Sequence, residues 1–569
     1  MASEKSVIEQ FKLLCIEVDK EVLDKCVSVC EEYGIDAEDF TEQWVTFTVN
    51  HLNDAPPTLE NLDLFVRKEF SKRAANRHSA STKESTRAVT GAGLTVYAAP
   101  VSAQYPFSTY VSLISNYMST TPKVCIIVCL FNFRGHSAKY LSRANQGAIV
   151  HSYGPEELLQ TLGTPITSTD VINVSQVPND DGDLFTKAVF GFELLHEKVG
   201  TFDNHINFLS QCIIKKNGLG EAVSVRQKTQ NEVVVCGRVE CDADARLNPR
   251  SVVLQGTWED SLSQAVPLDL DSVQQYALFP GQVVAVRGVN PRGDRFLASQ
   301  VYCDGARPEV EPDDIAKEIN ISGDISIVVA AGPYTTSDNM AYEPLKDLVA
   351  YIGTHKPHVV ILTGPFVDSD HAKVKDNSMA ETYKSFFEKL MDTLSELNTT
   401  SPHTKLYVVS SLKDAFHVNV YPTCPYSSRR KHPNVHFVPD PSTLDIGGHL
   451  IGVTATDVLM HLGQEEIALG PSGDKLGRLC SHLLTQQSYY PLWPAAVPVD
   501  AALWAAHAQM PCTPHVLVLP SNFRYFVKEV NGCVVVNPER LTKGEGGGTF
   551  ARLRLRSAGP RVTAQVLRV

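Results

Sequence analysis

The sequence predicts a multidomain α+β protein with four parts in order: an N-terminal helical bundle, a flexible linker, a small β-barrel and a large α/β sandwich. Three observations predict this arrangement. Apolar residues recur at helical spacing over Ser6–Phe70, short strand-like runs fill Asn231–Cys303, and strands alternate with helices from Ile321 onward. A chain of 569 residues is long enough for several cores. The expected boundaries are 1–75 for the bundle, 76–205 for the linker, 206–310 for the barrel and 320–569 for the sandwich.

Composition and charge narrow the class of function. The 51 basic and 64 acidic residues give a net charge of −13, which does not favour a protein that holds duplex DNA by its phosphates. Thirteen cysteines occur without Cys-x-x-Cys pairs, as is typical of a protein in a reducing compartment. A zinc site on Cys26 and Cys30 would lack a second ligand pair at metal spacing, so core thiols are favoured there. Glu4 and Lys5 interrupt the apolar run that a secretory signal needs, and we expect no membrane span.

The N-terminal block is predicted to be helical. Val7, Phe11 and Leu14 recur three or four residues apart, which is typical of one apolar helix face. Gly34 is a natural C-cap, and a last helix is expected over Leu59–Phe70. The pattern favours a small helical bundle with no chemistry of its own.

A polar tract marks the linker. The composition of Ser79–Thr86 cannot bury enough apolar surface to fold, and residues 76–205 are expected to be largely disordered. One apolar run, Val124–Phe131, has high β-propensity and would be an aggregation hazard if exposed. Thr121 and Thr164 each precede a proline and are candidate phosphorylation sites.

Over Asn231–Cys303 the spacing of the apolar residues changes from that of helices to that of β-strands. Short β runs lie at Val233–Val239, Ser251–Gln255, Gly281–Gly288 and Phe296–Tyr302, separated by turns rich in glycine, proline and asparagine. Short strands with glycines inside them are typical of a small closed barrel such as the OB-fold.

Two roles stay open for this barrel. Binding of single-stranded DNA would require aromatic and basic residues on one face, for which Arg238, Arg287 and Phe296 are candidates. The strands are mainly aliphatic, however, and this favours packing of the barrel against the C-terminal domain.

From Ile321 the order of expected strands and helices resembles that of calcineurin-like metallophosphoesterases, but the metal ligands of that family are missing. Such enzymes hold two metal ions with Asp, His and Asn side chains at strand ends. In this chain the four expected ligand positions lie at or beside Ala331, Pro365, Lys413 and Asn522. Alanine and proline cannot ligate a metal, and a lysine repels one. We therefore expect no catalytic residues, no metal and no cofactor.

Some polar and aromatic residues of this region have alternative interpretations. Asp368, Asp414 and Asp457 could hold a single cation. Tyr489, Tyr490 and Trp493 are set among prolines and could form a partner-binding patch, although a buried aromatic cluster explains them equally well. The histidines of the C-terminal domain lack companion carboxylates at the strand ends, so we expect them to be structural. They are His449, His461, His482, His507 and His515.

Six longer phrases resemble the regulatory B subunits of DNA polymerase alpha–primase. They are Phe279–Val284, Gly332–Asp338, Leu362–Asp368, Gln487–Leu492, Phe523–Lys528 and Asn537–Gly544. Glu539 departs from the pattern, because the family usually has glycine there. The linker also looks unlike the family, but Ser137–Gly147 resumes its pattern. This leads to the hypothesis that residues 105–134 are an extra or mis-spliced insert, which sequencing of the transcript across the junction would test.

The resemblance implies a nuclear, non-catalytic accessory subunit of the polymerase alpha–primase complex, active in the initiation of DNA replication and in RNA–DNA primer synthesis. It implies that the OB-fold and the inactive phosphoesterase domain together bind the zinc-bearing C-terminal region of the catalytic subunit. Both primase subunits would join through the complex, the N-terminal domain would recruit replication-initiation factors, and DNA contact would be indirect. Two alternatives remain: a metal-dependent phosphodiesterase with a degenerate site, or the B subunit of polymerase delta or epsilon.

Overall fold

The computed structural model describes two compact units, Met1–Asn132 and Phe133–Val569. In the first unit the described residues are 19–33, 57–67 and the single positions 7, 8, 11, 37, 40, 41, 44, 47 and 48. In the second they are 137–164, 172–179, 182–307, 324–376, 378–379, 381–470, 473–556 and 561–569. Residues 105–134, including Thr121 and the apolar run Val124–Phe131, therefore lie outside the described residues.

The N-terminal unit contains helices α2 (Lys20–Tyr33) and α4 (Leu59–Phe65), which contact each other. Helix α4 begins at a capped end, because the Thr58 hydroxyl accepts a hydrogen bond from Asn61 N–H (3.3 Å). The ring of Phe65 lies 5.5 Å from that of Trp44 and 5.1 Å from that of Phe47, and all three side chains are buried. Both helices lie where helical spacing predicted them.

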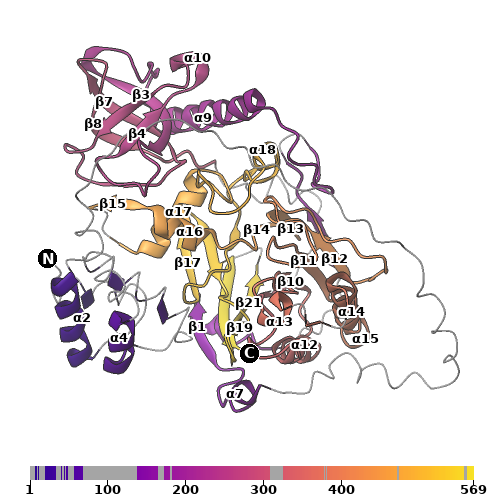
Figure 1. Ribbon diagram of the computed structural model, residues 1–569. Coiled ribbons are helices and arrows are strands. Elements are labelled where there is room, and N and C mark those ends of the chain that lie inside the picture. The colour runs from indigo at the N-terminus through magenta and orange to yellow at the C-terminus, as the bar shows by residue number, and fades with distance from the viewer. Residues whose placement is uncertain are drawn as a thin grey trace, which may run out of the picture. The chain divides into compact units, whose positions relative to one another are not determined.

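The second unit contains a sandwich of two sheets. One sheet has seven strands in the order β1-β22-β21-β9-β10-β11-β12, and the other has six in the order β17-β18-β16-β14-β13-β2 (Figure 1). The seven strands are β1 (Ile149–Tyr153), β9 (Ile325–Ala331), β10 (Val359–Thr363), β11 (Lys405–Val409), β12 (Val435–Val438), β21 (Thr549–Leu555) and β22 (Val562–Arg568). The six are β2 (Val174–Gln176), β13 (Ser442–Ile446), β14 (His449–Val453), β16 (Val516–Val518), β17 (Phe526–Val530) and β18 (Cys533–Asn537). The predicted strands that precede the four ligand positions are confirmed as β9, β10, β11 and β16.

Alternation of side chains builds the core between these sheets. Strands β9 to β12 run parallel, and every second residue, such as Ile325, Ile327 and Val329 of β9, enters one buried apolar cluster with residues of both sheets. Helices cover the outer faces: α14 packs on β12 and α17 on β17. The helices of this part are α7 (Ala138–Leu141), α8 (Glu156–Leu159), α12 (Glu343–His355), α13 (Ala372–Lys375), α14 (Tyr383–Ser395), α15 (Leu397–Thr400), α16 (Val458–Glu465), α17 (Lys475–Thr485) and α18 (Ala501–His507).

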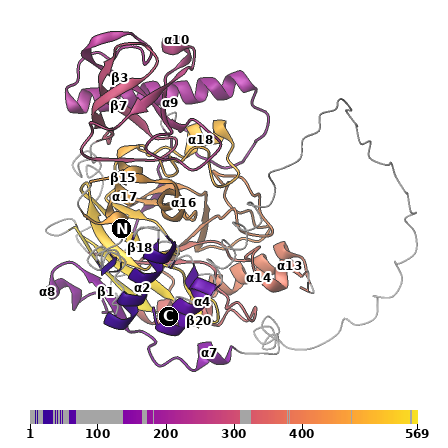
Figure 2. The same ribbon diagram turned by 60° about the vertical axis from the view of Figure 1, so that its left-hand side comes forward.

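The predicted barrel is confirmed as a closed five-stranded barrel in the order β3-β4-β5-β8-β7. Its strands are β3 (Thr229–Cys241), β4 (Val252–Gln255), β5 (Ala265–Asp269), β7 (Val283–Asn290) and β8 (Phe296–Tyr302), with the short helix α10 (Trp258–Ser261) between β4 and β5. Gly288 is needed for closure, because a Cβ atom there would lie 2.1 Å from the Leu297 carbonyl oxygen. Helix α9 (Leu195–Asn217) packs its apolar stripe on the outside of β3 and β7, and Figure 2 shows it running along the barrel.

Two segments of the expected linker, β1 and β2, are built into the sandwich. Strand β1 pairs with β22, with Tyr153 opposite Ala564, and β2 pairs with β13, with Val174 opposite Ile446. The prediction of a largely disordered linker is therefore wrong for these segments. The strand partners lie hundreds of residues away along the chain, so no local pattern could reveal them.

Two small ribbons complete the unit. Strand β6 (Tyr276–Leu278) of the barrel region pairs with β15 (Ile467–Leu469), and β19 (Thr542–Lys543) pairs with β20 (Gly546–Gly547). None of the described helices combines the length and the apolar character that crossing a membrane requires.

Candidate functional site: the strand-end loops and the domain junction

The loops that follow β9, β10, β11 and β16, here called the strand-end loops, carry the four predicted ligand positions. Ala331 is the buried last residue of β9, and Pro365 follows β10 after a cis peptide bond. Lys413 lies exposed after β11, where its ammonium nitrogen is 3.8 Å from Asp370. Asn522 follows β16 and is partly buried. Strands β9, β10 and β11 belong to the seven-stranded sheet and β16 to the six-stranded sheet. Ligands of parallel sheets generally bind beyond the carboxyl ends of the strands.

A guanidinium group links these loops instead. Arg540 is 8% exposed, and its Nη2 lies 3.6 Å from the Asp457 carboxylate. Its Nε donates to Asn522 Oδ1 (3.3 Å) and its Nη1 to the Gly332 carbonyl oxygen (3.5 Å). Asp457 also accepts hydrogen bonds from the Ser521 hydroxyl (2.6 Å) and from Asn522 N–H (2.7 Å). A cation supplied by the chain thus holds the ends of β9 and β16 together.

An aromatic stack and a buried carboxyl fill the other side of the strand-end loops. The rings of Tyr334 and Phe366 stack with centroids 4.8 Å apart, and the Tyr334 hydroxyl donates to the Thr363 carbonyl oxygen (3.0 Å). Asp414 accepts the backbone N–H groups of Phe366 (2.8 Å) and Val367 (2.6 Å) and the hydroxyl of Tyr426. Burial raises the pKa of Asp414 to about 7, although these three hydrogen bonds act in the opposite direction.

These residues do not fit a dinuclear metal centre. The oxygens of Asp414 and Asp457 are engaged in the contacts above, and Arg540 and Lys413 would repel a dication. Within the described part of the chain, His, Cys, Asp and Glu side chains nowhere gather in a group of three that could hold a metal ion. The alternative of a single cation shared by Asp368, Asp414 and Asp457 is therefore wrong, because these carboxylates do not form such a group.

The second feature is the junction between the barrel and the sandwich, here called the domain junction. Strand β6 pairs with β15, so that Leu278 lies opposite Ile467. The side chain of Gln486 replaces a strand partner for β7: its Oε1 accepts Val283 N–H (2.8 Å), and its Nε2 donates to the Val283 carbonyl oxygen (3.0 Å). The same Nε2 donates to the Cys303 carbonyl oxygen (3.1 Å). Gln486 and Val283 are both buried, where unpaired amides would be costly.

An ion cluster beside β15 strengthens the domain junction. The Glu466 carboxylate accepts from Arg478 Nε (2.8 Å) and Nη2 (2.9 Å) and lies 2.8 Å from His482 Nε2. Burial opposes ionisation of Glu466, but the bonds from His482 and Arg478 outweigh it and lower its pKa to about 2. The His482 ring packs on Phe279 of the barrel, with centroids 4.9 Å apart. His482 thus connects Glu466 to the barrel, a carboxylate partner that the sequence reasoning did not expect.

Two of the recognised phrases meet at the domain junction. Gly281 adopts φ +96°, and a Cβ atom there would lie 2.4 Å from Trp493 N and 2.7 Å from the Pro491 carbonyl oxygen. Trp493 N–H donates to the Pro280 carbonyl oxygen (3.0 Å). The Trp493 ring packs on Phe202 of α9, with centroids 4.5 Å apart. Phe279–Val284 and the segment that follows Gln487 therefore contact each other at the domain junction.

The predicted partner-binding patch is wrong for two of its three residues. Tyr489 and Tyr490 are buried: the Tyr489 hydroxyl is 2.7 Å from Thr443 Oγ1, and the Tyr490 hydroxyl is 3.0 Å from His461 Nδ1. A partner cannot reach them, because Tyr489 is 2% exposed and Tyr490 is fully buried. Trp493 keeps partial exposure at the domain junction.

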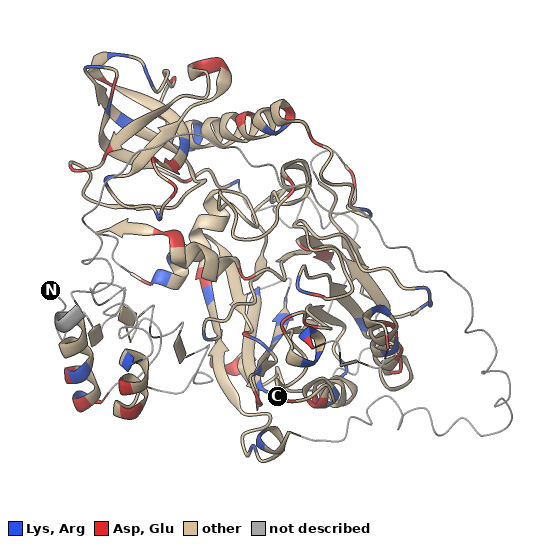
Figure 3. Cartoon of the chain, viewed as in Figure 1, with Lys and Arg blue, Asp and Glu red and all other residues tan. Residues whose placement is uncertain are grey.

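The predicted single-strand-binding face is also wrong for two of its residues. Phe296 is a fully buried core residue of the barrel. Arg238 is buried against Phe202, where its guanidinium donates to Glu240 (2.6 Å) and Gln255 (2.6 Å). Arg287 remains partly exposed on β7. Figure 3 shows basic and acidic segments interspersed over the barrel and α9, a distribution that differs from the basic stripe of a nucleic-acid groove.

Of the two candidate phosphorylation sites, Thr164 is described. It is exposed at the end of a turn after α8, where its hydroxyl donates to the Thr161 carbonyl oxygen (2.7 Å).

The sequence reasoning missed Arg540 and Gln486, which both lie in or beside recognised phrases. Both are long polar side chains next to strands that the sequence predicts to be buried. That combination is the signal that could have identified them.

Comparisons with known proteins agree along the chain. Residues 5–72 match the family model of the N-terminal region of the DNA polymerase alpha B subunit, and residues 199–304 match the model of its OB domain. Residues 327–528 match the model of the DNA polymerase alpha/epsilon B subunit. The DNA polymerase alpha B subunit of Mus musculus is 37% identical over 450 residues, which cover 76% of this chain and 74% of the mouse protein.

More distant relatives carry the same name. The B subunit of Drosophila melanogaster is 31% identical over 606 residues, which cover 98% of this chain and 97% of the fly protein. That of Schizosaccharomyces pombe is 29% identical over 404 residues and covers 65% of this chain and 69% of the yeast protein. The chain therefore belongs to the family of DNA polymerase alpha B subunits, which are accessory subunits of that polymerase.

Proposed function

We propose that this chain is the non-catalytic accessory subunit of a DNA polymerase alpha–primase complex and that it holds and regulates the catalytic subunit during primer synthesis. The observation that carries the proposal is its similarity to the fly protein over 97% of that protein's length. The B subunits of polymerase delta and epsilon fit less well, because the barrel and the N-terminal residues match models named for alpha alone.

In this proposal the sandwich is a calcineurin-like phosphoesterase fold that has lost its catalytic function. Two-metal hydrolysis needs ligands that clamp the attacking and leaving oxygens. At the strand-end loops the chain has Ala331 and Pro365 instead, and the Arg540 guanidinium links two of the four loops. These contacts of Arg540 stabilise the strand-end loops, and they occupy the side chains that would otherwise bind a metal pair.

The same proposal assigns the partners. The barrel and the sandwich, joined by the domain junction, would together bind the zinc-bearing C-terminal region of the catalytic subunit, and both primase subunits would join through it. The N-terminal domain, residues 1–75 with helices α2 and α4, would recruit replication-initiation factors. The complex would act in the nucleus, and DNA contact would be indirect, in keeping with the net charge of −13.

Affinity purification of the tagged full chain from nuclear extract, read by mass spectrometry, tests the proposal. We expect the polymerase alpha catalytic subunit and both primase subunits in near-equal amounts. Recovery of polymerase delta or epsilon would instead assign the chain to a sister branch. A parallel assay with bis-(p-nitrophenyl) phosphate and Mn²⁺ should give no metal-dependent hydrolysis, and a rate that rises with Mn²⁺ would support the phosphodiesterase alternative.

A further inference from the structure

Three arginines lie in a row on one face of the seven-stranded sheet. Arg552 and Arg554 belong to β21, and Arg556 follows the strand directly. Because they are spaced two residues apart, their side chains leave the backbone on the same side. Arg552 is 9% exposed and Arg554 is 8% exposed. We call these three side chains the arginine row.

The positive charge of the arginine row exceeds the negative charge beside it. Among the described residues, the one carboxylate within 4.0 Å of the row is that of Asp324, at 3.0 Å from Arg556 Nε and 4.0 Å from Arg554 Nη1. Burial lowers the pKa of Arg554, and the like charges of Arg556 and Arg552 act in the same direction. Buried cations without matching anions are costly, so a further anion placed here would be stabilising.

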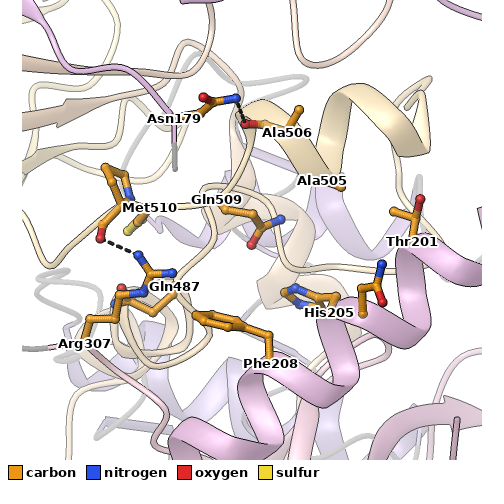
Figure 4. Close-up of a pocket in the computed structure, with 12 residues that line it drawn as sticks. Asn179, Thr201, His205, Phe208, Arg307, Gln487, Ala505, Ala506, Gln509 and Met510 are labelled. Atoms are coloured by element: carbon orange, nitrogen blue, oxygen red, sulfur yellow. Dashed lines mark hydrogen bonds between the residues drawn. The ribbon is translucent and has the colours of Figure 1, made fainter. Parts of the chain in front are cut away.

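Arg307, an arginine elsewhere in this unit, shows the contrast. It lines a cavity of about 200 Å³ between α9 and α18, where it donates to the Pro511 carbonyl oxygen (2.6 Å) and lies 4.7 Å from the centre of the Phe208 ring (Figure 4). A carbonyl oxygen and an aromatic face thus stabilise its charge. The buried Nε of Arg554, by comparison, has no hydrogen-bond acceptor within the described residues.

Arg552 has partners, but they carry no charge. Its Nη2 donates to the Gln565 side-chain oxygen (2.7 Å) and its Nη1 to the Tyr351 hydroxyl (3.1 Å). A guanidinium has five N–H donors, so these contacts leave donors over for an anion.

The turn after α8 lies against the arginine row. A Cβ atom at Gly163 would be 3.3 Å from both Nη1 and Nη2 of Arg552, so the backbone there contacts the guanidinium. The next residue, Thr164, is exposed, and its hydroxyl donates to the Thr161 carbonyl oxygen (2.7 Å). Thr164 is therefore one residue away from the point where the chain contacts Arg552.

The sequence makes Thr164 a substrate for proline-directed kinases, because Pro165 follows it. Ser401 and Thr513 also precede prolines, but they are 2% and 3% exposed, so a kinase reaches Thr164 more readily. A phosphate on threonine carries nearly two negative charges and three strong acceptor oxygens. Guanidinium groups bind such oxygens through paired, charge-assisted hydrogen bonds.

We propose that Thr164 is a phosphorylation site whose phosphate binds the arginine row at Arg552 and Arg554. In the transfer, the Thr164 hydroxyl oxygen bonds to the γ-phosphorus of ATP, the bond from that phosphorus to the bridging oxygen of the departing ADP breaks, and the hydroxyl proton passes to a base of the kinase. Arg552 and Arg554 leave the strand about 7 Å apart, a separation that two long side chains can close around one phosphate. The modification would tie the turn after α8 to β21. It goes beyond the accessory-subunit function and does not depend on it.

The test uses the full chain with Thr121→Ala, which removes the other candidate phosphorylation site. A proline-directed mitogen-activated protein kinase with Mg²⁺ and ATP should add phosphate at Thr164, as located by mass spectrometry. In a ³¹P NMR titration the second pKa of this phosphate should lie about one unit or more below its usual value of about 6, because two guanidinium groups favour the dianion. A folded chain that accepts no phosphate at Thr164, or a phosphate whose pKa stays near 6, would overturn the proposal.

Variants of the arginine row locate the phosphate. Arg552→Gln and Arg554→Gln should each return the pKa of the phosphate at least halfway to 6. Arg556→Gln is the matched control, since Arg556 is on the same face but pairs with Asp324 and lies about 13 Å along the strand from Arg552. It should change the pKa least. Thermal unfolding checks that each variant is folded, and Arg552→Lys, which keeps the charge but loses the paired donors, takes the place of a Gln variant that is not. The same phosphate pKa in all the variants as in the natural row would contradict the proposal.

Discussion

At the scale of single residues, Arg540 explains how the strand-end loops can be stable without metal. Carboxylates and carbonyls at strand ends repel one another unless a cation lies between them. Arg540 supplies that cation from the chain, with contacts to Asp457, Asn522 and Gly332. These contacts tie the loops after β9 and β16 to Asp457 and so stabilise this end of the sandwich.

The turn at Glu539 gives a prediction about backbone strain. Glu539 adopts φ +65°, a conformation that favours glycine, yet its buried carboxylate lies 2.6 Å from Lys543 Nζ and accepts the Thr549 hydroxyl (3.1 Å). Glu539→Gly and Glu539→Ala both remove these contacts, but only glycine relieves the left-handed backbone. We expect the Gly variant to be about 1 kcal/mol more stable than the Ala variant in urea unfolding. Equal stability of the two would show that the turn is unstrained.

Glu466 gives a prediction about pH. Its folded pKa of about 2 lies below the unfolded value of 4.5, so its stabilising contribution is present above pH 4.5 and is lost as the pH falls through 2. Glu466→Gln leaves Arg478 and His482 without their carboxylate and should cost about 3 kcal/mol at pH 7. The difference from the natural chain should shrink steadily between pH 4.5 and pH 3 in urea unfolding. Glu465→Gln, one residue away and less buried, is the control and should change little at any pH.

At the scale of elements, local patterns predicted the strands whose neighbours follow closely along the chain. Four of the five barrel strands (β3, β4, β7 and β8) and β9, β10, β11 and β16 were found because alternation and turn residues mark them. Strands β1 and β2 were missed because each pairs with a distant strand, and β5 because its five residues include Pro267. The sequence could not show whether the aromatic side chains around Tyr489 are buried or exposed, because it does not say which side of a loop faces the core.

The contact between the barrel loop and the sandwich gives the prediction at this scale. Gly281→Ala would place its methyl group 2.4 Å from Trp493 N, in addition to straining a backbone at φ +96°. Gly532 in the β17–β18 hairpin is the matched control, because it has φ +82° and nothing within 4 Å of a Cβ atom. We expect Gly532→Ala to cost about 1 kcal/mol from strain alone. Gly281→Ala should cost at least 2 kcal/mol more in the same unfolding assay, as overpacking does. Equal losses of stability in the two variants would mean that the domain junction accommodates the added methyl group without a free-energy cost.

At the scale of the whole second unit, the two domains are joined by several unlike contacts. These are the β6–β15 ribbon, the hydrogen bonds of Gln486, the ion cluster at Glu466 and the packing of Trp493 on Phe202. None of these contacts is extensive on its own, but each one positions the others. We therefore infer that the barrel and the sandwich unfold together. A surface formed by both domains would then keep a fixed shape when a partner binds, which is what an accessory subunit needs.

This inference gives the last prediction, made by cutting the chain. A fragment of residues 195–307 keeps α9 and the closed barrel but loses the partner of Val283, whose N–H and C=O are held by Gln486 in the whole chain. We expect the fragment to melt on the order of 10 °C below the barrel in the whole chain, because a loss of about 2 kcal/mol is large for about a hundred residues. Hydrogen exchange should then be faster at Val283 in particular. A fragment of residues 133–569, which keeps the domain junction, should retain the protection seen in the full chain. If the barrel fragment alone matched that protection, the two domains would be independent, and the idea of one rigid binding body would fail.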